Sequence, residues 1–244
     1  MKSLSIKLIE LLIAKGFKLP LSFSELVKGF YKRILYKQLL DTLKINCVID
    51  AGANNGGFAK QLRSLGYADY ILSFEPDPFA YAELHSHFAN DSRWKGYNLA
   101  LGSTDSQLIL NINEFSVMNS FLSGNENTSA TVKTISVEVK TLDSLANDVL
   151  CLNSDVRIFL KMDTQGFDLE VMKGVQALRD KIFLLQSEIS IQPLYKNMPH
   201  YLESLQFYET LDFELVDLFS VTRNSKGVIE YDAIMISTSD ARIK

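Results

Sequence analysis

From residue 46 onward, short apolar runs alternate with segments whose apolar positions recur every three or four residues. The runs predict buried strands, and the segments predict amphipathic helices. Regular alternation of the two favours an α/β fold, with a mostly parallel sheet and helices on both faces. The predicted strands are Cys47–Asp50, Tyr70–Phe74, Gly96–Leu101, Arg157–Met162, Ile182–Ile189, Glu214–Leu218 and Tyr231–Ser237, and the predicted helices are Phe58–Leu65, Pro78–Asn90, Leu142–Val149, Leu169–Leu178 and His200–Leu211.

Two further runs depart from this alternation. Leu108–Asn113 and Val132–Val139 alternate apolar and polar residues at period two, which is typical of half-buried strands. The stretch between them, Asn119 to Thr131, is rich in Ser, Asn and Thr. We therefore predict a β-hairpin insertion with a polar tip, which could act as a substrate lid or be an ordinary surface loop.

Residues 1–45 have a third pattern. Apolar positions recur at helical spacing on both sides of Leu19-Pro20, and no strand is indicated. We predict two or three short amphipathic helices up to about Leu43, forming an N-terminal helical arm ahead of a main domain at residues 46–244. The arm could pack on the sheet, cap a ligand site or form a homodimer contact.

The composition of the chain limits the class of protein to which it can belong. A chain of 244 residues that is 47% hydrophobic can bury a sizeable core in one domain. Its two cysteines, Cys47 and Cys151, are too few for a disulfide framework and favour free thiols in a reducing compartment. No run approaches the roughly 20 apolar residues that span a bilayer, and Glu10 interrupts any signal-peptide pattern at the start. We expect a cytoplasmic protein.

Charge is spread unevenly along the chain. Residues 1–45 carry nine Lys or Arg against three acidic residues, whereas the rest has a net charge of −10. The basic arm could contact a membrane surface or another anionic partner, or could be a solvated helix face. The acidic body argues against a nucleic-acid-binding protein, in which a basic stripe is typical.

The stretch Val48-Ile49-Asp50-Ala51-Gly52-Ala53-Asn54-Asn55-Gly56-Gly57 is the main candidate for a ligand site. A strand, a glycine-rich turn and a helix start in this order are typical of nucleotide binding. Asn54 occupies the middle place of a G-x-G-x-x-G pattern, where a side chain crowds the pyrophosphate of a dinucleotide. Asp50 suits a cationic ligand, and Glu75 after the next strand could accept bonds from ribose hydroxyls. S-adenosyl-L-methionine fits these features, and an NAD-dependent oxidoreductase is the disfavoured alternative.

These residues and three later blocks resemble the FkbM-type S-adenosylmethionine-dependent methyltransferases. The resemblance covers residues 46 to 238. It is carried by the turn, by Phe74-Glu75-Pro76, by Asn98-Leu99-Ala100-Leu101-Gly102, by Leu160-Lys161-Met162-Asp163-Thr164-Gln165-Gly166-Phe167-Asp168-Leu169-Glu170-Val171-Met172-Lys173-Gly174 and by Gln186-Ser187-Glu188. Gln165 and Asp168 stand where many members have glutamate, so Gln165 is not predicted to be a base.

The resemblance implies a Rossmann-like class I methyltransferase with a seven-stranded sheet whose last strand is antiparallel. It further implies O-methylation of a hydroxyl on a sugar, a glycan or a secondary metabolite. The implied cofactor-binding residues are Asp50, Gly52, Asn54 and Gly56 for the methionine part, Glu75 for the ribose, and Ala100, Leu101 and Gly102 near the adenine. Ala53 and Pro76, beside them, are also predicted to bind the cofactor.

Methyl transfer to a hydroxyl needs an in-line approach and a group that takes the proton. Asp163 is the first candidate base because it ends a strand at the expected crevice, Glu188 is the second, and His200 is a third candidate as base or substrate contact. Asp163 could instead cap the following helix. A divalent metal between Asp163 and Glu188 is not favoured, since no third acid or histidine accompanies them. A non-catalytic binding protein of the same fold is the remaining alternative.

Overall fold

The computed structural model describes residues 21–126, 128, 130–150, 152, 153 and 155–239. The chain divides into two compact units, residues 1–38 and 39–244, and each is described by itself. The helical segments predicted before residue 21, and Cys151, lie outside the described residues.

Helix α2 (Leu21–Thr42) is one continuous helix where the pattern predicted shorter ones. No proline interrupts it, and its single glycine, Gly29, costs only about 1 kcal/mol relative to alanine in a helix interior. The second unit begins at Leu39, near the end of this helix.

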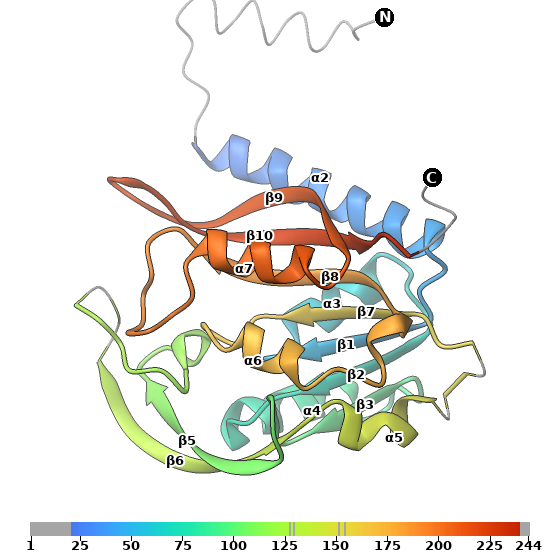
Figure 1. The fold of residues 1–244 in the computed structure, drawn as a ribbon, viewed down its shortest axis with the longest axis horizontal. Helices are drawn as coiled ribbons and strands as arrows, with labels where there is room; N and C mark the ends of the chain where they lie inside the picture. Colours follow the sequence, from blue (N-terminus) through green and yellow to red (C-terminus); the bar gives the residue numbers. More distant parts are fainter. Residues whose placement is uncertain (1–20, 127, 129, 151, 154, 240–244) are drawn as a thin grey trace, which may run out of the picture. The chain divides into compact units, whose positions relative to one another are not determined.

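The second unit is built on a seven-stranded sheet with the order β3-β2-β1-β7-β8-β10-β9 (Figure 1). Neighbouring strands pair in parallel except at β10, which is antiparallel to both β8 and β9. The predicted α/β fold and its antiparallel last strand are therefore confirmed. The strands are β1 (Cys47–Ala51), β2 (Tyr70–Phe74), β3 (Trp94–Tyr97), β7 (Ile158–Met162), β8 (Ile182–Ser190), β9 (Phe213–Asn224) and β10 (Gly227–Ser237).

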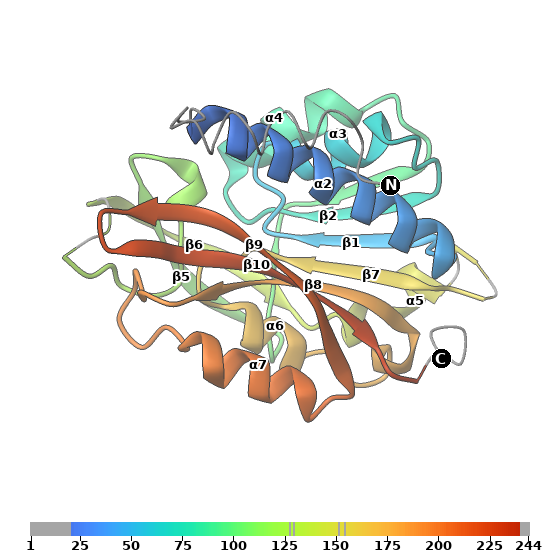
Figure 2. The same cartoon turned by 90° about the horizontal axis from the view of Figure 1, so that it is seen from above.

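Helices cover both faces of this sheet (Figure 2). Helices α3 (Gly57–Ser64) and α4 (Pro78–Phe88) lie on one face. Helices α6 (Asp168–Lys173) and α7 (Tyr201–Glu209) lie on the other, and share one buried cluster with α5 (Ala146–Leu150). Every residue of β1 and β7 is buried, as expected for parallel strands covered on both faces.

The predicted strand Gly96–Leu101 is wrong as a single element. It is divided between β3 in the main sheet and β4 (Ala100–Leu101), which pairs with the insertion. At the break, the Asn98 side-chain amide donates to the backbone oxygen of Glu75 at 2.8 Å. Ala100 and Leu101 are buried just as the main-sheet strands are, so an apolar pattern cannot reveal the change of sheet.

The predicted hairpin insertion is confirmed. Strands β5 (Ser106–Asn113) and β6 (Thr131–Lys140) pair antiparallel, and with β4 they form a three-stranded sheet of order β4-β6-β5. A short 3-10 helix, η1 (Ser116–Met118), lies between the two long strands.

Several element boundaries differ from the predictions. Helix α6 ends at Lys173 because the next residue, Gly174, approaches the chain after β4 so closely that a Cβ would lie 2.0 Å from the Gly102 oxygen. The remaining apolar positions of the predicted helix fall in a turn, which η3 (Arg179–Lys181) follows. The start of the segment predicted as Leu142–Val149 is η2 (Asp143–Leu145). Strands β9 and β10 both extend well beyond their predicted bounds into a long hairpin.

Candidate functional site

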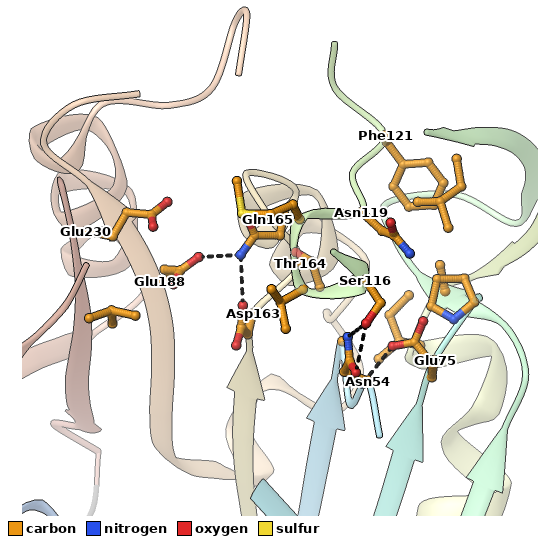
Figure 3. Close-up of a pocket in the computed structure, with 18 of the residues that line it drawn as sticks. Asn54, Glu75, Ser116, Asn119, Phe121, Asp163, Thr164, Gln165, Glu188 and Glu230 are labelled. Carbon is orange, nitrogen blue, oxygen red and sulfur yellow. Dashed lines mark hydrogen bonds between the residues drawn. The ribbon is translucent and has the colours of Figure 1, made fainter. Parts of the chain in front are cut away.

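A cavity of about 290 Å³ lies at the edge of the main sheet where β1, β2 and β7 end (Figure 3). This is the edge at which ligands bind in open α/β sheets, and the volume is near the lower end of small-molecule sites. Because β10 is antiparallel to β8, the start of β10 lies at the same edge as the end of β8. Of the predicted site residues, Gly52, Asn54, Glu75, Pro76, Ala100, Leu101, Asp163 and Glu188 line the cavity.

Gly52 brings the turn after β1 into direct contact with the end of β7. Its φ is +73°, and a Cβ at this position would lie 2.0 Å from the backbone oxygen of Asp163. The Asp163 N–H donates to the Ala51 oxygen at 3.1 Å. Glycine is therefore required here both for the backbone conformation and for the close approach.

Glu75 is held by backbone N–H groups at the end of β2. Its Oε2 accepts from the Asn54 N–H at 2.7 Å, and its Oε1 accepts from the Asp77 N–H at 2.8 Å. Burial raises the pKa of Glu75 to about 7, although these two bonds oppose the shift. Each carboxylate oxygen keeps a lone pair, so Glu75 can still accept hydrogen bonds from two hydroxyl groups in the cavity.

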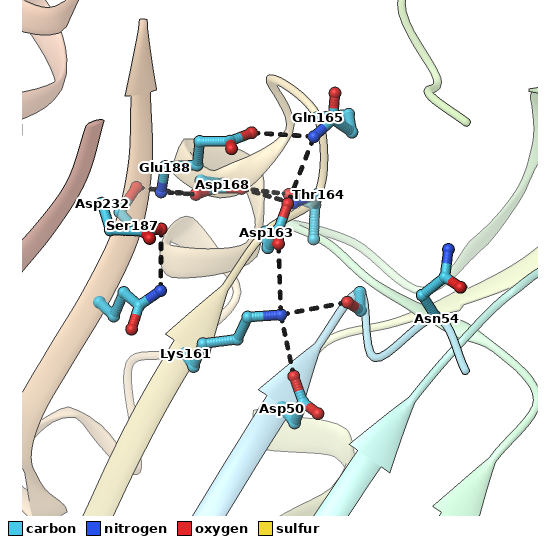
Figure 4. A network of polar contacts seen from close by, with 12 residues as sticks. Asp50, Asn54, Lys161, Asp163, Thr164, Gln165, Asp168, Ser187, Glu188 and Asp232 are labelled. Atoms are coloured by element: carbon cyan, nitrogen blue, oxygen red, sulfur yellow. Dashed lines mark hydrogen bonds and ion pairs between the residues drawn. The ribbon is translucent and has the colours of Figure 1, made fainter. Parts of the chain in front are cut away.

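Asp50 lies beneath the turn, outside the set of residues that line the cavity. It is fully buried, and Lys161 Nζ lies 3.0 Å from its Oδ1, 3.2 Å from the Gly52 oxygen and 3.6 Å from Asp163 Oδ2 (Figure 4). Burial raises the pKa of Asp50, and Lys161 opposes that shift. Direct contact between Asp50 and a cofactor stays a prediction, whereas its contact with the turn through Lys161 is observed.

Gln165 joins the two candidate acids. Its Nε2 donates to Glu188 Oε2 at 2.8 Å and to Asp163 Oδ1 at 3.3 Å, while its Oε1 accepts from the Tyr195 hydroxyl at 2.8 Å. An amide can donate to two carboxylates, which an ionised glutamate at this position could not. A glutamine at this position therefore adds no negative charge between the two neighbouring acids, as a glutamate would.

Asp168 fixes the loop after β7 to the end of β8. It accepts from the Thr164 N–H at 2.9 Å, the Ser187 hydroxyl at 2.7 Å and the Glu188 N–H at 3.0 Å. Burial raises the pKa of Asp168, and its hydrogen bonds oppose the shift. The N-cap of α6 is Phe167, so the alternative that Asp163 caps this helix is wrong.

The insertion supplies one wall of the cavity, which its sequence alone did not establish. Ser116, Met118, Asn119 and Phe121 line this wall. The wall is tied to the rest of the site, since the Tyr195 hydroxyl donates to the Met118 oxygen at 2.9 Å and Asn54 Nδ2 donates to Ser116 Oγ at 3.0 Å.

The hairpin of β9 and β10 adds Val221, Thr222 and Glu230, which the sequence analysis missed. Glu230 is 3% exposed, and its Oε1 has no hydrogen-bond partner among the described residues. Burial raises the pKa of Glu230 to about 7, and the charges of Asp163, Asp168 and Asp232 add to the shift. The feature of the sequence that could have indicated Glu230 as a site residue is its position as an acidic residue between the apolar Ile229 and Tyr231.

Three other predicted site residues lie outside the cavity lining. Ala53 and Gly56 are in the turn, where Gly56 begins α3 with a φ of +84° and meets Leu84 and Phe88 of α4. His200 precedes α7, with its ring 4.4 Å from that of Tyr201. Within the described ranges, no group of three or more His, Cys, Asp or Glu side chains is arranged to hold a metal ion.

The sheet order, the antiparallel β10 and the position of the cavity define a Rossmann-like class I methyltransferase fold. The Methyltransferase FkbM domain model matches residues 50–215, more than half of the chain, and the protein belongs to this family. The protein is accordingly a methyltransferase with S-adenosylmethionine as methyl donor. Gly52 and Glu75 fit this donor, since they form a close turn and a carboxylate with free acceptor capacity.

Comparison with solved structures finds similar chains at low identity. An rRNA methylase from Streptococcus thermophilus is 11% identical, with a TM-score of 0.42 over 81% of this chain and 92% of that one. A Streptococcus mutans protein described as a methyltransferase, solved with SAH, is 11% identical, with a TM-score of 0.44 over 83% and 95%. Fibrillarin from Methanococcus jannaschii, a pre-rRNA processing protein, is 12% identical, with a TM-score of 0.46 over 80% and 68%. A search of curated proteins finds no match.

Proposed function

We propose that this methyltransferase transfers its methyl group to a hydroxyl oxygen of a sugar, a glycan or a secondary metabolite. The observation that carries the proposal is the arrangement of one cavity that Gly52 helps to line, with Asn54 and Glu75 at one end and the carboxylates of Asp163 and Glu188 beyond them (Figure 3). A hydroxyl group must lose its proton on methylation, and a carboxylate beside it can take that proton.

The donor supplies a methyl group on a sulfonium, so that an S–C bond breaks, an O–C bond forms and S-adenosylhomocysteine is the other product. The turn at Gly52 and the carboxylate of Glu75 are proposed to hold the donor at one end of the cavity. Holding two reactants in line can lower the barrier by up to ~7–11 kcal/mol. Orientation is thus the main contribution expected of these residues.

Asp163 is the proposed proton acceptor. It follows β7 directly, contacts the turn through its backbone, and its side chain is 39% exposed. The Gln165 amide and Lys161 hold the carboxylate in position, at 3.3 Å and 3.6 Å. A positioned base contributes on the order of 10²–10⁴ in rate. Glu188 is the second candidate for this role.

The partners follow from charge and composition. The net charge of −10 outside residues 1–45 supports a small-molecule or glycan acceptor in preference to a nucleic acid.

The free thiol of Cys47 supports a cytoplasmic location. In the described part of the chain, no helix combines the length and apolar character needed to cross a membrane. Contact of the basic arm with an anionic surface, and dimerisation, stay predictions.

Two measurements test the function. Calorimetric titration should show binding of S-adenosylmethionine and none of NAD, and the reverse result would contradict the cofactor assignment. Incubation with cell extract and donor labelled in its methyl group should then yield a labelled product. Mass spectrometry should place the label on oxygen, and label on nitrogen or carbon would contradict O-methylation.

A further inference from the structure

Two glutamates lie side by side at the end of the cavity opposite Glu75. In the register of β8 with β10, Glu230 lies opposite Ser190, and Asp232 lies opposite Glu188. Residues two apart on a strand share a face, so Glu188 and Glu230 are diagonal neighbours on one face of the sheet, about 7–8 Å apart at their Cα atoms. Both line the cavity, and Figure 3 shows their carboxyl groups on the side away from Asn54 and Glu75.

Neither carboxylate has a positive partner among the described residues. Glu188 accepts one hydrogen bond, from Gln165 Nε2, and Oε1 of Glu230 accepts none although it is buried. Lys161, which is buried at the same edge of the sheet, is engaged by Asp50 and Asp163. Buried polar atoms in proteins are nearly always hydrogen-bonded, so an unpartnered carboxylate oxygen in a cavity wall indicates a group that enters the cavity.

Their charge identifies the kind of group. An isolated buried carboxylate is costly unless it is paired with a positive charge. Burial, together with the charges of Asp163 and Glu230, raises the pKa of Glu188 well above its usual value. Neutral hydroxyl groups could donate hydrogen bonds here, but they would leave burial to favour the protonated form of both carboxyls. A ligand cation would favour the ionised form of both and pair with it.

We propose that the methyl acceptor carries a protonated amine or a similar nitrogen cation, held between Glu188 and Glu230, with its hydroxyl presented to Asp163. The inference rests on the O-methyltransferase function proposed above and names the substrate class for that same site. Val221 lines the cavity and is 48% exposed, so the rest of a larger acceptor can extend into solvent.

The first experiment compares two sugars that differ by one group. Protein saturated with S-adenosylhomocysteine is titrated with methyl glucosaminide, which is cationic at neutral pH, and with methyl glucopyranoside, which is neutral. We expect the amine to bind at least tenfold more tightly in ligand-observed NMR. Equal binding of the two sugars, or binding of neither, would overturn the inference.

Two matched variants test whether the preference for the amine over the neutral sugar arises at Glu230. Glu230→Gln should remove the preference for the amine while leaving the affinity for S-adenosylhomocysteine unchanged, which also shows that the variant is folded. Glu214→Gln makes the same charge change at an exposed position of β9 and should keep the preference. A preference that survives in Glu230→Gln would refute the assignment.

The order of the measurements separates the two proposals. Failure of S-adenosylhomocysteine to bind would count against the methyltransferase assignment itself. If it binds, and label from the donor enters the hydroxyl of an uncharged acceptor in extract, the proposed function stands and the inference of a cationic acceptor falls.

Discussion

The proposed role of Glu75 and its burial have opposite effects on the protonation state of its carboxyl group. In its proposed role, Glu75 must be ionised to accept hydrogen bonds from two ligand hydroxyls, yet burial raises its pKa to about 7. The backbone N–H groups of Asn54 and Asp77 hold both oxygens in place before any ligand arrives. The affinity of the donor end of the cavity should therefore depend on pH near neutrality.

The Glu75→Ala variant tests this role. Loss of hydrogen bonds to a charged acceptor should weaken S-adenosylmethionine binding by ~1.5–3 kcal/mol, measured by calorimetry. In the unchanged protein, affinity for 5′-methylthioadenosine, which keeps the ribose and lacks the titrating amino group, should rise as the pH increases from 6 to 8. Glu75→Gln should abolish that rise. A rise that persists in Glu75→Gln would assign it to another group.

Asp163 and Glu188 are separated by the Gln165 amide, and their substitution should give different results. Asp163→Asn should lower the rate of label transfer by ~10²–10⁴ while the donor affinity changes little, because the proton acceptor is lost. Glu188→Gln should act mainly on the acceptor KM. Retained transfer in Asp163→Asn would leave Asp163 with a purely structural role.

Glu75 and Asp163 could be predicted from the sequence, because each directly follows a short apolar strand with a clear end. Glu230 could not, because its strand was predicted to begin at Tyr231, whereas β10 begins at Gly227. The alternation of apolar and polar residues is a weak signal where both faces of a hairpin are partly polar. In such a hairpin, the register of β10 with β8 decides which side chains face the cavity.

At the scale of elements, the turn between β1 and α3 depends on its contact with β7. Two glycines with positive φ make a matched test: Gly52, where an added Cβ would lie 2.0 Å from the Asp163 oxygen, and Gly66, where an added Cβ would meet no atom within 4 Å. Gly66→Ala should cost about 1–2 kcal/mol for its backbone conformation alone.

Gly52→Ala should cost more than Gly66→Ala in denaturant unfolding, and it should also lower donor affinity because the turn must move away from β7. Equal costs in the two variants, with donor binding intact, would show that the contact is unimportant.

The helices and strands also show which structural features could not be predicted from the sequence. The alternation of apolar runs identified the sheet strands and the hairpin insertion, but it joined β3 and β4 into one strand. The two pieces pair in different sheets, β3 half-buried and β4 buried, so the change of partner depends on tertiary contacts such as that of Asn98 with Glu75.

For the whole molecule, the buried acids at the sheet edge make stability depend on pH. Glu75 and Glu230 each have a folded-state pKa of about 7 against an ordinary value of 4.5, so each binds a proton more tightly in the folded chain. Their contribution to the unfolding free energy is fully present below pH 4.5 and is lost as the pH rises through 7.

Chemical denaturation between pH 5 and pH 8 should show this loss, which is at most about 3 kcal/mol for each group. Glu230→Gln should lessen the decline, and Glu214→Gln should follow the unchanged protein, since Glu214 is exposed. Parallel curves for all three proteins would show that Glu230 does not titrate in this range.

The family match ends at residue 215, before Val221, Thr222 and Glu230. The part of the chain that matches the family model therefore carries the proposed donor end of the cavity, while the β9–β10 hairpin, most of which lies beyond the match, supplies part of the proposed acceptor end. Proteins matched by the same family model can thus share a methyl donor without sharing an acceptor. Grouping them by the residues of the β9–β10 hairpin should sort them by substrate better than overall similarity, and exchange of that hairpin should exchange acceptor preference.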